Sequence, residues 1–175
     1  RERYQLSAFT IRCFDLLGAI KNTGCLALAL LNGEGVTAGC EGDVPALISM
    51  MIINELSGSL SFMANPSSID SKKSTAIFAH CTMPLNMTLG YELDSHFESR
   101  LGVAIRGAVP GGAGTIFKIS NELDEYWASP IDIIANLNRD NLCRTQIEVK
   151  VEKGVDYFLT RPFGNHYIIA NGDHT

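Results

Sequence analysis

The spacing of apolar residues changes near residue 60, and this change constrains the fold more strongly than any other feature of the sequence. Before that point, apolar residues recur every three to four positions, as in helices. The pattern predicts three helices and one strand: Tyr4 to Ile20, a helix capped by Thr23 and ended by Asn32-Gly33, Val44 to Ser57, and the strand Val36 to Cys40. Helix, strand and helix in this order form the tail of an α/β layer, which we expect over residues 1–59.

Beyond residue 60 the chain consists of short β-like segments, most of them separated by turn residues. The expected strands are Leu60–Ala64, Thr75–Thr82, Val103–Ala108, Gly114–Ile119, Ile131–Leu137 and Thr145–Val151. Expected turns lie at Pro66-Ser67-Ser68 and Pro110-Gly111-Gly112, and Val155 to Thr160 is expected to be a short helix. Many short strands with little helix predict a small, mostly antiparallel, barrel-like domain over residues 60–175, so the predicted fold class is α+β.

The turn Cys40-Glu41-Gly42-Asp43 places a carboxylate between the expected strand and the third helix. Asp43 is a good N-cap, Pro45 suits the first helical turn, and Gly58 can end the helix. The partial positive charge at a helix N-terminus favours the ionised form of Glu41. An ionised, partly shielded glutamate there can be a metal ligand or a proton acceptor; the alternative is a solvated acid in a helix-entry turn.

Other polar residues lie at the ends of expected elements. Asn65 ends the first strand of the β region, His80 lies near the end of the second, and His166 lies near the C-terminus. A histidine is more often a hydrogen-bonded core or surface residue than a ligand. Metal sites nevertheless gather such groups from separate segments, so Glu41, His80 and His166 together suggest a site.

Several of these segments resemble one family when taken in order. Cys40-Glu41-Gly42-Asp43, Phe62-Met63-Ala64-Asn65, Ala79-His80 and Gly164-Asn165-His166 follow the order and approximate spacing of the L-fucose and L-arabinose isomerases. Ile11-Arg12-Cys13-Phe14 and the segment from His96 to Gly102 also fit. The resemblance spans nearly all 175 residues. It implies the C-terminal portion of a fucose-isomerase-like protein, and therefore a fragment of a longer chain.

The resemblance implies an aldose–ketose isomerase that uses manganese or another divalent cation. Glu41 matches the first carboxylate ligand, and His80 and His166 match the histidines. Catalytic roles would fall to Glu41 and His80, and Asn165 would contact the sugar.

The second carboxylate of the family is missing, because Ala64 and Asn65 occupy the two positions where its branches have an acid. Asn65 can offer a neutral oxygen to the metal but cannot act as a base. Three alternatives stay open: an isomerase with this altered site, an isomerase that takes the acid from Asp70 or Asp43, and a non-catalytic sugar-binding or regulatory relative. By family analogy we also expect a homo-oligomer, and no activity from this fragment alone.

Composition excludes other classes of partner. A net charge of -5 and a pI near 5.3 argue against nucleic acid. Apolar stretches are interrupted before they reach membrane-spanning length, so no membrane partner is expected. The five cysteines are scattered without a C-x-x-C pair, which indicates buried thiols in a reducing, cytoplasmic compartment. A nucleophilic role for Cys40 or Cys81 is the less favoured alternative.

The glycine-rich segment from Gly107 to Gly114 suggests two interpretations. It lacks the Gly-Lys-Ser/Thr ending of a phosphate-binding loop, and no clear helix follows it. We therefore expect a turn between two strands.

Overall fold

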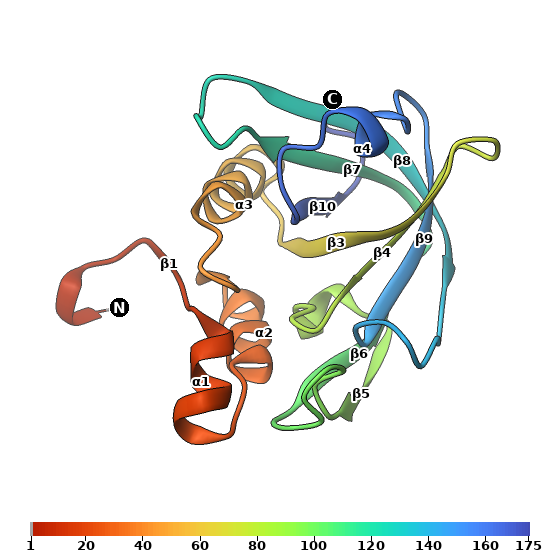
Figure 1. Cartoon of the computed structure of the whole chain (residues 1–175). Helices are drawn as coiled ribbons and strands as arrows, with labels where there is room; N and C mark the ends of the chain where they lie inside the picture. The colour runs from red at the N-terminus through yellow and green to blue at the C-terminus, as the bar shows by residue number, and fades with distance from the viewer. Residues whose placement is uncertain (1) are drawn as a thin grey trace.

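The protein is a mixed α+β fold in which helices cover one side of a closed, six-stranded antiparallel barrel (Figure 1). The structure, a computed structural model, describes residues 2–175. The helical elements are η1 (Glu2–Tyr4), α1 (Cys13–Ile20), α2 (Cys25–Gly33), α3 (Val44–Ser57), η2 (Leu85–Met87) and α4 (Tyr157–Thr160). The strands are β1 (Ala8–Thr10), β2 (Thr37–Gly39), β3 (Ser61–Asp70), β4 (Thr75–His80), β5 (Gly90–Asp94), β6 (Ala104–Ala108), β7 (Gly112–Ile119), β8 (Tyr126–Asn136), β9 (Thr145–Val151) and β10 (Tyr167–Asn171).

The barrel closes in the order β10-β3-β4-β9-β8-β7, and every neighbouring pair is antiparallel. Successive side chains of a strand point to opposite faces, so one set of alternating residues fills the interior. The largest of these interior side chains are Phe62, Phe78, Ile116, Ile131, Ile147 and Tyr167. Complete burial of each contributes roughly 1.5–3 kcal/mol, which makes this interior the main source of stability.

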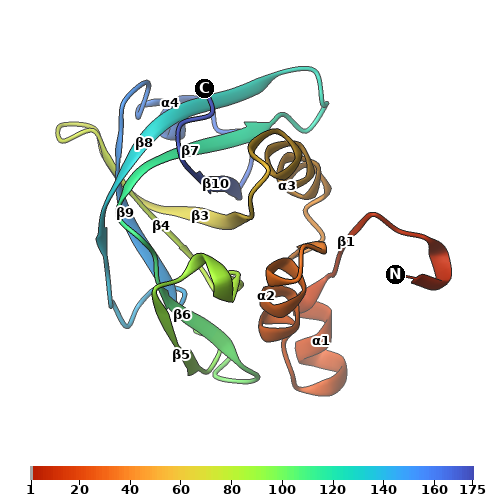
Figure 2. The same ribbon diagram turned by 180° about the vertical axis from the view of Figure 1, so that it is seen from behind.

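Helix α3 packs on the outer face of the barrel, across β3, β7 and β10 (Figure 2). Met50 and Ile53 of the helix share an apolar cluster with Met63, Phe117 and Ile168 of those strands.

The local signals that predicted α3 act as expected. The Asp43 side chain accepts a hydrogen bond from the Ala46 backbone N–H at 2.8 Å, Pro45 lies in the first turn, and Gly58 ends the helix at φ 63°. The third helix is thus confirmed at Val44–Ser57.

The first predicted helix was wrong over its N-terminal half. Residues Ala8–Thr10 form β1, which pairs in parallel with β2 through Phe9↔Ala38, and α1 begins only at Cys13. Helical spacing alone cannot reveal a strand whose stability comes from a partner some thirty residues away. Leu6, which precedes β1, and Phe14, in the first turn of α1, are both exposed.

The β region holds two further departures from prediction. Pro66 to Ser68, expected as a turn, lies inside β3, where the pairing with β4 shifts register between Pro66 and Ser68. A bulge of this kind accommodates proline within a strand. Strands β5 and β10 were not predicted at all. The glycine-rich segment does form the connection between β6 and β7.

The barrel strands begin at Ser61, after a short connection from the end of α3 at Ser57. The division of the chain into two domains near residue 60 stays a prediction, because α3 and the barrel share one apolar cluster. Residue 1 lies outside the described residues. Within residues 2–175, no helix has the length and apolar character that crossing a membrane requires.

Candidate metal centre

Glu41 lies in the turn between β2 and α3, in an unusual backbone conformation. Its φ is 59° and that of Gly42 is 71°, so both adopt the left-handed region. A residue with a side chain pays roughly 1–2 kcal/mol for this conformation. The turn aims the carboxylate at two histidines, and the strain is a physical reason to suspect a functional position.

The two histidines contact opposite oxygens of the Glu41 carboxylate. His80 Nε2 lies 3.6 Å from Glu41 Oε1, and His166 Nε2 lies 3.5 Å from Glu41 Oε2. The imidazole rings meet edge to face, with centroids 5.3 Å apart. His80 ends β4 and His166 directly precedes β10, so the barrel and the β2–α3 turn bring the three residues together.

Both imidazoles are fixed by a second contact at Nδ1. His80 Nδ1 lies 2.8 Å from Thr82 Oγ1, and His166 Nδ1 lies 2.9 Å from Asp43 Oδ2. Each ring therefore turns Nε2 toward Glu41. A carboxylate on the far nitrogen of a histidine is the usual support of a metal-bound imidazole. His166 Nε2 is buried and makes no hydrogen bond among residues 2–175, so apart from its 3.5 Å contact with Glu41 Oε2 it is open to a ligand.

Asp43 links His166 to a buried lysine, Lys118. Lys118 Nζ lies 3.5 Å from Asp43 Oδ1, and the Lys118 side chain is 0% exposed. A buried ammonium is destabilising without a counter-ion, and Asp43 supplies that counter-ion to Lys118. The same carboxylate also contacts His166 and caps the start of α3.

These contacts set the charge states in the absence of metal. Burial would raise the pKa of Glu41, but its contacts with His166 and His80 outweigh burial and hold it well below 4.5. Burial would lower the pKa of His166, but Asp43 and Glu41 outweigh it and raise the pKa above 6.5. Burial lowers the pKa of Lys118, and Asp43 opposes this shift. Glu41 is consequently ionised at neutral pH, as a ligand must be.

A cavity of about 210 Å³ opens beside Glu41 and His80. Asn65 and all five cysteines line it, together with His96 and Glu98 from the loop after β5. Cys40, Glu41 and His80 each offer one ligand atom within 4.8 Å of the other two. The five cysteines are free thiols, and four of them are buried.

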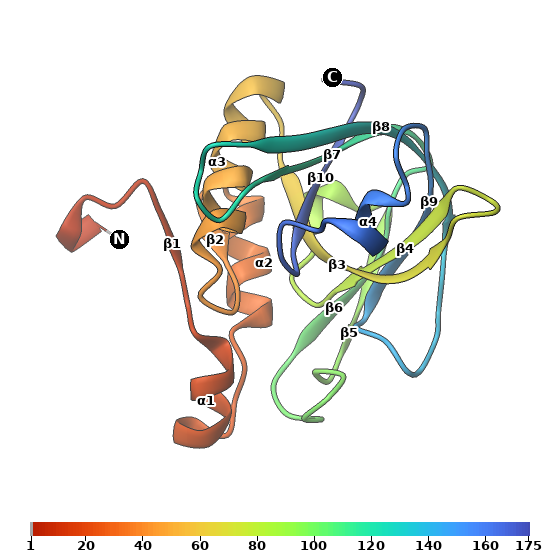
Figure 3. The same cartoon turned by 45° about the horizontal axis from the view of Figure 1, so that its top comes forward.

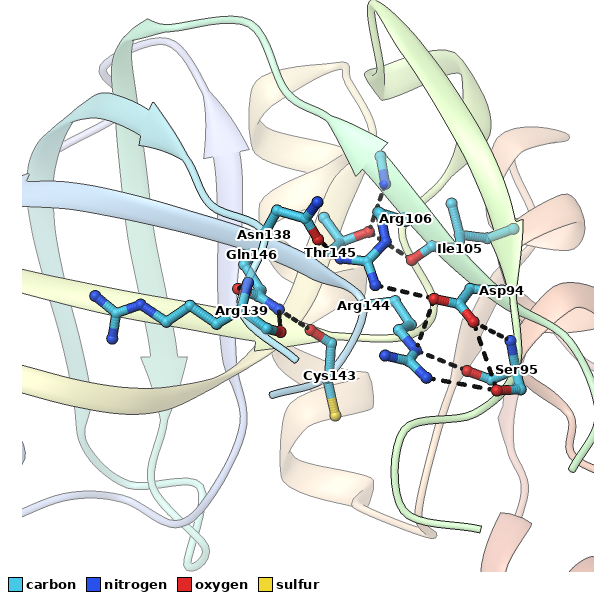
Figure 4. A network of polar contacts seen from close by, with 11 residues as sticks. Asp94, Ser95, Ile105, Arg106, Asn138, Arg139, Cys143, Arg144, Thr145 and Gln146 are labelled. Atoms are coloured by element: carbon cyan, nitrogen blue, oxygen red, sulfur yellow. Dashed lines mark hydrogen bonds and ion pairs between the residues drawn. The ribbon is translucent and has the colours of Figure 1, made fainter. Parts of the chain in front are cut away.

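A polar network holds two walls of this cavity in place (Figure 4). Asp94, at the end of β5, lies 2.9 Å from Arg106 Nη2 and 3.2 Å from Arg144 Nε. Arg144 also donates a hydrogen bond to the Ser95 carbonyl at 2.8 Å, and Gln146 donates one to the Cys143 carbonyl at 2.9 Å. The loop that carries His96 and the segment that carries Cys143 are thereby anchored to each other.

Of the remaining residues that the sequence suggested for the site, some line the cavity and others do not. Asn65 lines the cavity, whereas Ala64 is fully buried in the barrel interior. Asp70 contacts Lys73 at the surface and does not line the cavity, so it is not placed to supply the missing acid. Asn165 is exposed and lies outside the set of described residues that line the cavity. Its role as a substrate-binding residue stays a prediction.

The sequence reasoning missed Lys118 and Thr82. Lys118 is the single charged residue in the apolar run Thr115-Ile116-Phe117-Lys118-Ile119, and a lone lysine in such a strand was the available signal. Thr82 gave no signal, because its role follows from the tertiary position of His80.

Comparison with known proteins gives relatives at low identity. The chain is 28% identical over 128 residues to a sulfoquinovose isomerase of Priestia megaterium, which covers 70% of this chain and 29% of that protein. A sulfoquinovose isomerase of Clostridium sp. is 28% identical over 125 residues, covering 68% and 28%. One from Alkalicoccus urumqiensis is 23% identical over 186 residues, covering 97% and 41%. No protein-family model matches the chain.

The chain thus spans less than half the length of these curated relatives. The predicted resemblance to sugar isomerases is confirmed at this general level. A specific relationship to L-fucose isomerase stays a prediction. The chain is similar to part of proteins named sulfoquinovose isomerase.

Proposed function

We propose that the chain is the metal-binding portion of an aldose–ketose isomerase, in which Glu41, His80 and His166 hold a divalent cation such as manganese. One observation carries the proposal. Each oxygen of the ionised Glu41 carboxylate faces the Nε2 of a different histidine, at 3.6 and 3.5 Å, and the Nδ1 of each ring contacts a second side chain that holds its orientation. One carboxylate and two imidazoles form a mixed oxygen and nitrogen ligand set that suits manganese, iron, cobalt or zinc. Asn65 can add a neutral oxygen from the cavity wall.

The reaction proposed is transfer of hydrogen between C1 and C2 of a sugar through an enediol. When bound, the cation would stabilise negative charge on the sugar oxygens. Glu41 suits the role of ligand better than that of base, because its pKa is far below neutral. His80 presents one nitrogen to the site, so at that atom it can be a ligand or a proton acceptor, but not both at once.

The relatives suggest which sugar to test first. Sulfoquinovose is the sugar in the names of all three proteins, so we propose it as the primary substrate, with L-fucose and L-arabinose as the comparison. Assembly into a homo-oligomer is part of the same proposal.

A second candidate is a sugar-binding or regulatory relative without turnover. The specific observation in its favour is the missing second acid, since Ala64 is buried in the barrel interior and Asn65 is not a base. Asp43 does not compensate freely, because its two oxygens already bind His166, Lys118 and the Ala46 N–H. Bound sugar without ketose formation would favour this alternative.

The test is Glu41→Gln in the full-length protein. Glutamine keeps the size of the side chain but removes the charge, so manganese affinity should fall at least tenfold, and conversion of sulfoquinovose to its ketose should be lost. Metal titration and product analysis measure the two effects. Asp70→Asn is the matched control, because it removes an acid from the surface and should leave both unchanged.

Unchanged manganese uptake by Glu41→Gln would refute the ligand assignment. If the wild-type protein binds manganese normally but forms no ketose from sulfoquinovose, the isomerase proposal is refuted and the sugar-binding alternative remains.

A further inference from the structure

Two cysteines lie in contact beside the proposed metal centre. Cys13 Sγ and Cys40 Sγ are 3.1 Å apart, and both residues are free and buried, at 7% and 2% exposure. Cys13 is the first residue of α1, and Cys40 follows β2 and directly precedes Glu41. A disulfide needs a sulfur separation of about 2.05 Å, so a shift of about 1 Å suffices to form the bond.

The backbone around the two cysteines holds them together. Strands β1 and β2 pair in parallel up to Thr10↔Gly39, and the pairing continues past their ends. The Ile11 N–H donates to the Gly39 carbonyl at 3.3 Å, and the Gly42 N–H donates to the Ile11 carbonyl at 2.9 Å. Figure 3 shows these strands and helices α1 to α3 gathered on one side of the barrel. This pairing brings the segments that carry the two cysteines side by side, and both side chains pack in the apolar cluster beneath α3.

We propose that Cys13 and Cys40 form a redox-modification site, in which a peroxide converts the two thiols into a disulfide. Hydrogen peroxide oxidises one thiol to a sulfenic acid and releases one water. The second thiol attacks that sulfur, the S–S bond forms, and the sulfenic oxygen leaves as a second water. The two cysteines lose two electrons and two protons in total, and the peroxide O–O bond is the bond that breaks. A dithiol reductant reverses the change by thiol–disulfide exchange.

The site is accessible to a small oxidant. Both cysteines line the cavity of about 210 Å³ that also reaches Glu41 and His80. A molecule of the size of hydrogen peroxide fits such a cavity, whereas a large protein oxidant does not. Cys25, Cys81 and Cys143 line the same cavity, so the oxidant can reach them as well. Their oxidation state therefore tests whether the disulfide forms selectively between Cys13 and Cys40.

Formation of the disulfide has a consequence for the neighbouring residue, and this step rests on the proposed function. Closing the gap between the sulfurs moves Cys40, and Glu41 follows it in a turn already held at a positive φ. Metal sites tolerate displacements of only a few tenths of an ångström in their ligands. We therefore expect the oxidised protein to bind manganese at least tenfold more weakly, and to recover on reduction.

The experiment treats the metal-free, full-length protein with hydrogen peroxide, blocks the remaining thiols and maps disulfides by mass spectrometry. Digestion with trypsin and a glutamate-specific protease separates Cys25 from Cys40, because Glu34 lies between them. We expect a peptide that links Cys13 to Cys40 and disappears after treatment with dithiothreitol. It should be absent in Cys13→Ser and present in Cys143→Ser. Mapping the wild-type protein needs no variant to fold.

A disulfide among Cys25, Cys81 and Cys143 with Cys13 and Cys40 free would overturn the proposal, as would oxidation of either cysteine to a sulfinic acid without a link. Manganese titration of the oxidised and re-reduced protein then separates the two claims. A Cys13–Cys40 link with unchanged uptake would overturn the effect on the metal centre. Absence of uptake in both forms would overturn the proposed function while the redox site stands.

Discussion

At the scale of single residues, Asp43 connects three parts of the structure around the site. One oxygen accepts from the Ala46 N–H and faces Lys118, and the other contacts His166. The same carboxylate therefore starts α3, neutralises a fully buried ammonium and orients a proposed ligand. A single residue couples folding of the helix to the geometry around Glu41.

Asp43→Asn tests this coupling. Asparagine caps helices as well as aspartate does, so the start of α3 should be preserved. The charge is lost, however, and Lys118 is left buried without its counter-ion. We expect the free energy of unfolding to fall by about 3 kcal/mol, measured by chemical denaturation of the full-length protein.

The double variant Asp43→Asn with Lys118→Met is the control for this prediction. It removes both charges and should recover most of the lost stability, because a methionine of similar length fills the space without an ammonium. Equal stability of the single and double variants would show that Lys118 does not depend on Asp43.

The residue scale also shows what the sequence could reveal about the site. Glu41 and His80 were identified because each lies at the end of an expected element and matches a family motif, and His166 was identified from its motif near the C-terminus. Cys13 and Lys118 were not, because their partners are Cys40 and Asp43, which lie 27 and 75 positions away in the chain. Contacts over such distances depend on how β1, β2 and β7 are placed, and no local pattern specifies that.

At the scale of elements, the difference between α3 and β1 explains which parts of the fold were predictable. Asp43, Pro45 and Gly58 specify α3 from within the segment, so its two ends could be predicted from the sequence. β1 is three residues long and owes its conformation to β2, so its own spacing was misleading. β5 was missed for a related reason, since most of its residues are exposed and give no regular apolar alternation.

Strands β5 and β6 pair antiparallel outside the barrel, with Asp94 opposite Ala104, and this pair leads to a prediction about pH. The Arg106 guanidinium beside Asp94 holds the pKa of that carboxyl below its ordinary value of 3.8. A lowered folded-state pKa means that the ionised carboxylate stabilises the fold above about pH 3.8, and that this contribution is lost as the pH falls through the folded-state pKa. Asp94→Asn should therefore cost about 1 kcal/mol at pH 7, and the difference from wild type should shrink below pH 3.8.

Chemical denaturation of both proteins over a series from pH 7 to pH 3 measures this difference. Asp15→Asn is the matched control, because Asp15 forms an exposed ion pair with Arg12 and should give little difference at any pH. A difference between wild type and Asp94→Asn that stays constant across the series would contradict the assigned role of the carboxylate.

At the scale of the whole molecule, the candidate site joins residues of the barrel to residues of the helical side. His80 and His166 belong to barrel strands or their ends, whereas Glu41, Cys13 and Cys40 belong to the α-helical side. The cavity lies where these two parts meet, and residues of both line it. A change in either part, such as a disulfide between Cys13 and Cys40, therefore reaches the site directly.

The last prediction concerns the cavity as a whole. Its volume of about 210 Å³ is below the roughly 300–1,000 Å³ typical of small-molecule sites, and the relatives are more than twice as long as the matched region. Sugar isomerisation needs walls that exclude water and hold the substrate in a reactive position. We expect residues 1–175 alone to show no conversion of sulfoquinovose to a ketose in the presence of manganese, while the full-length protein shows it. Circular dichroism checks that the isolated chain is folded, and measurable turnover by that folded chain would contradict the prediction, because the cavity described here would then be sufficient for the reaction.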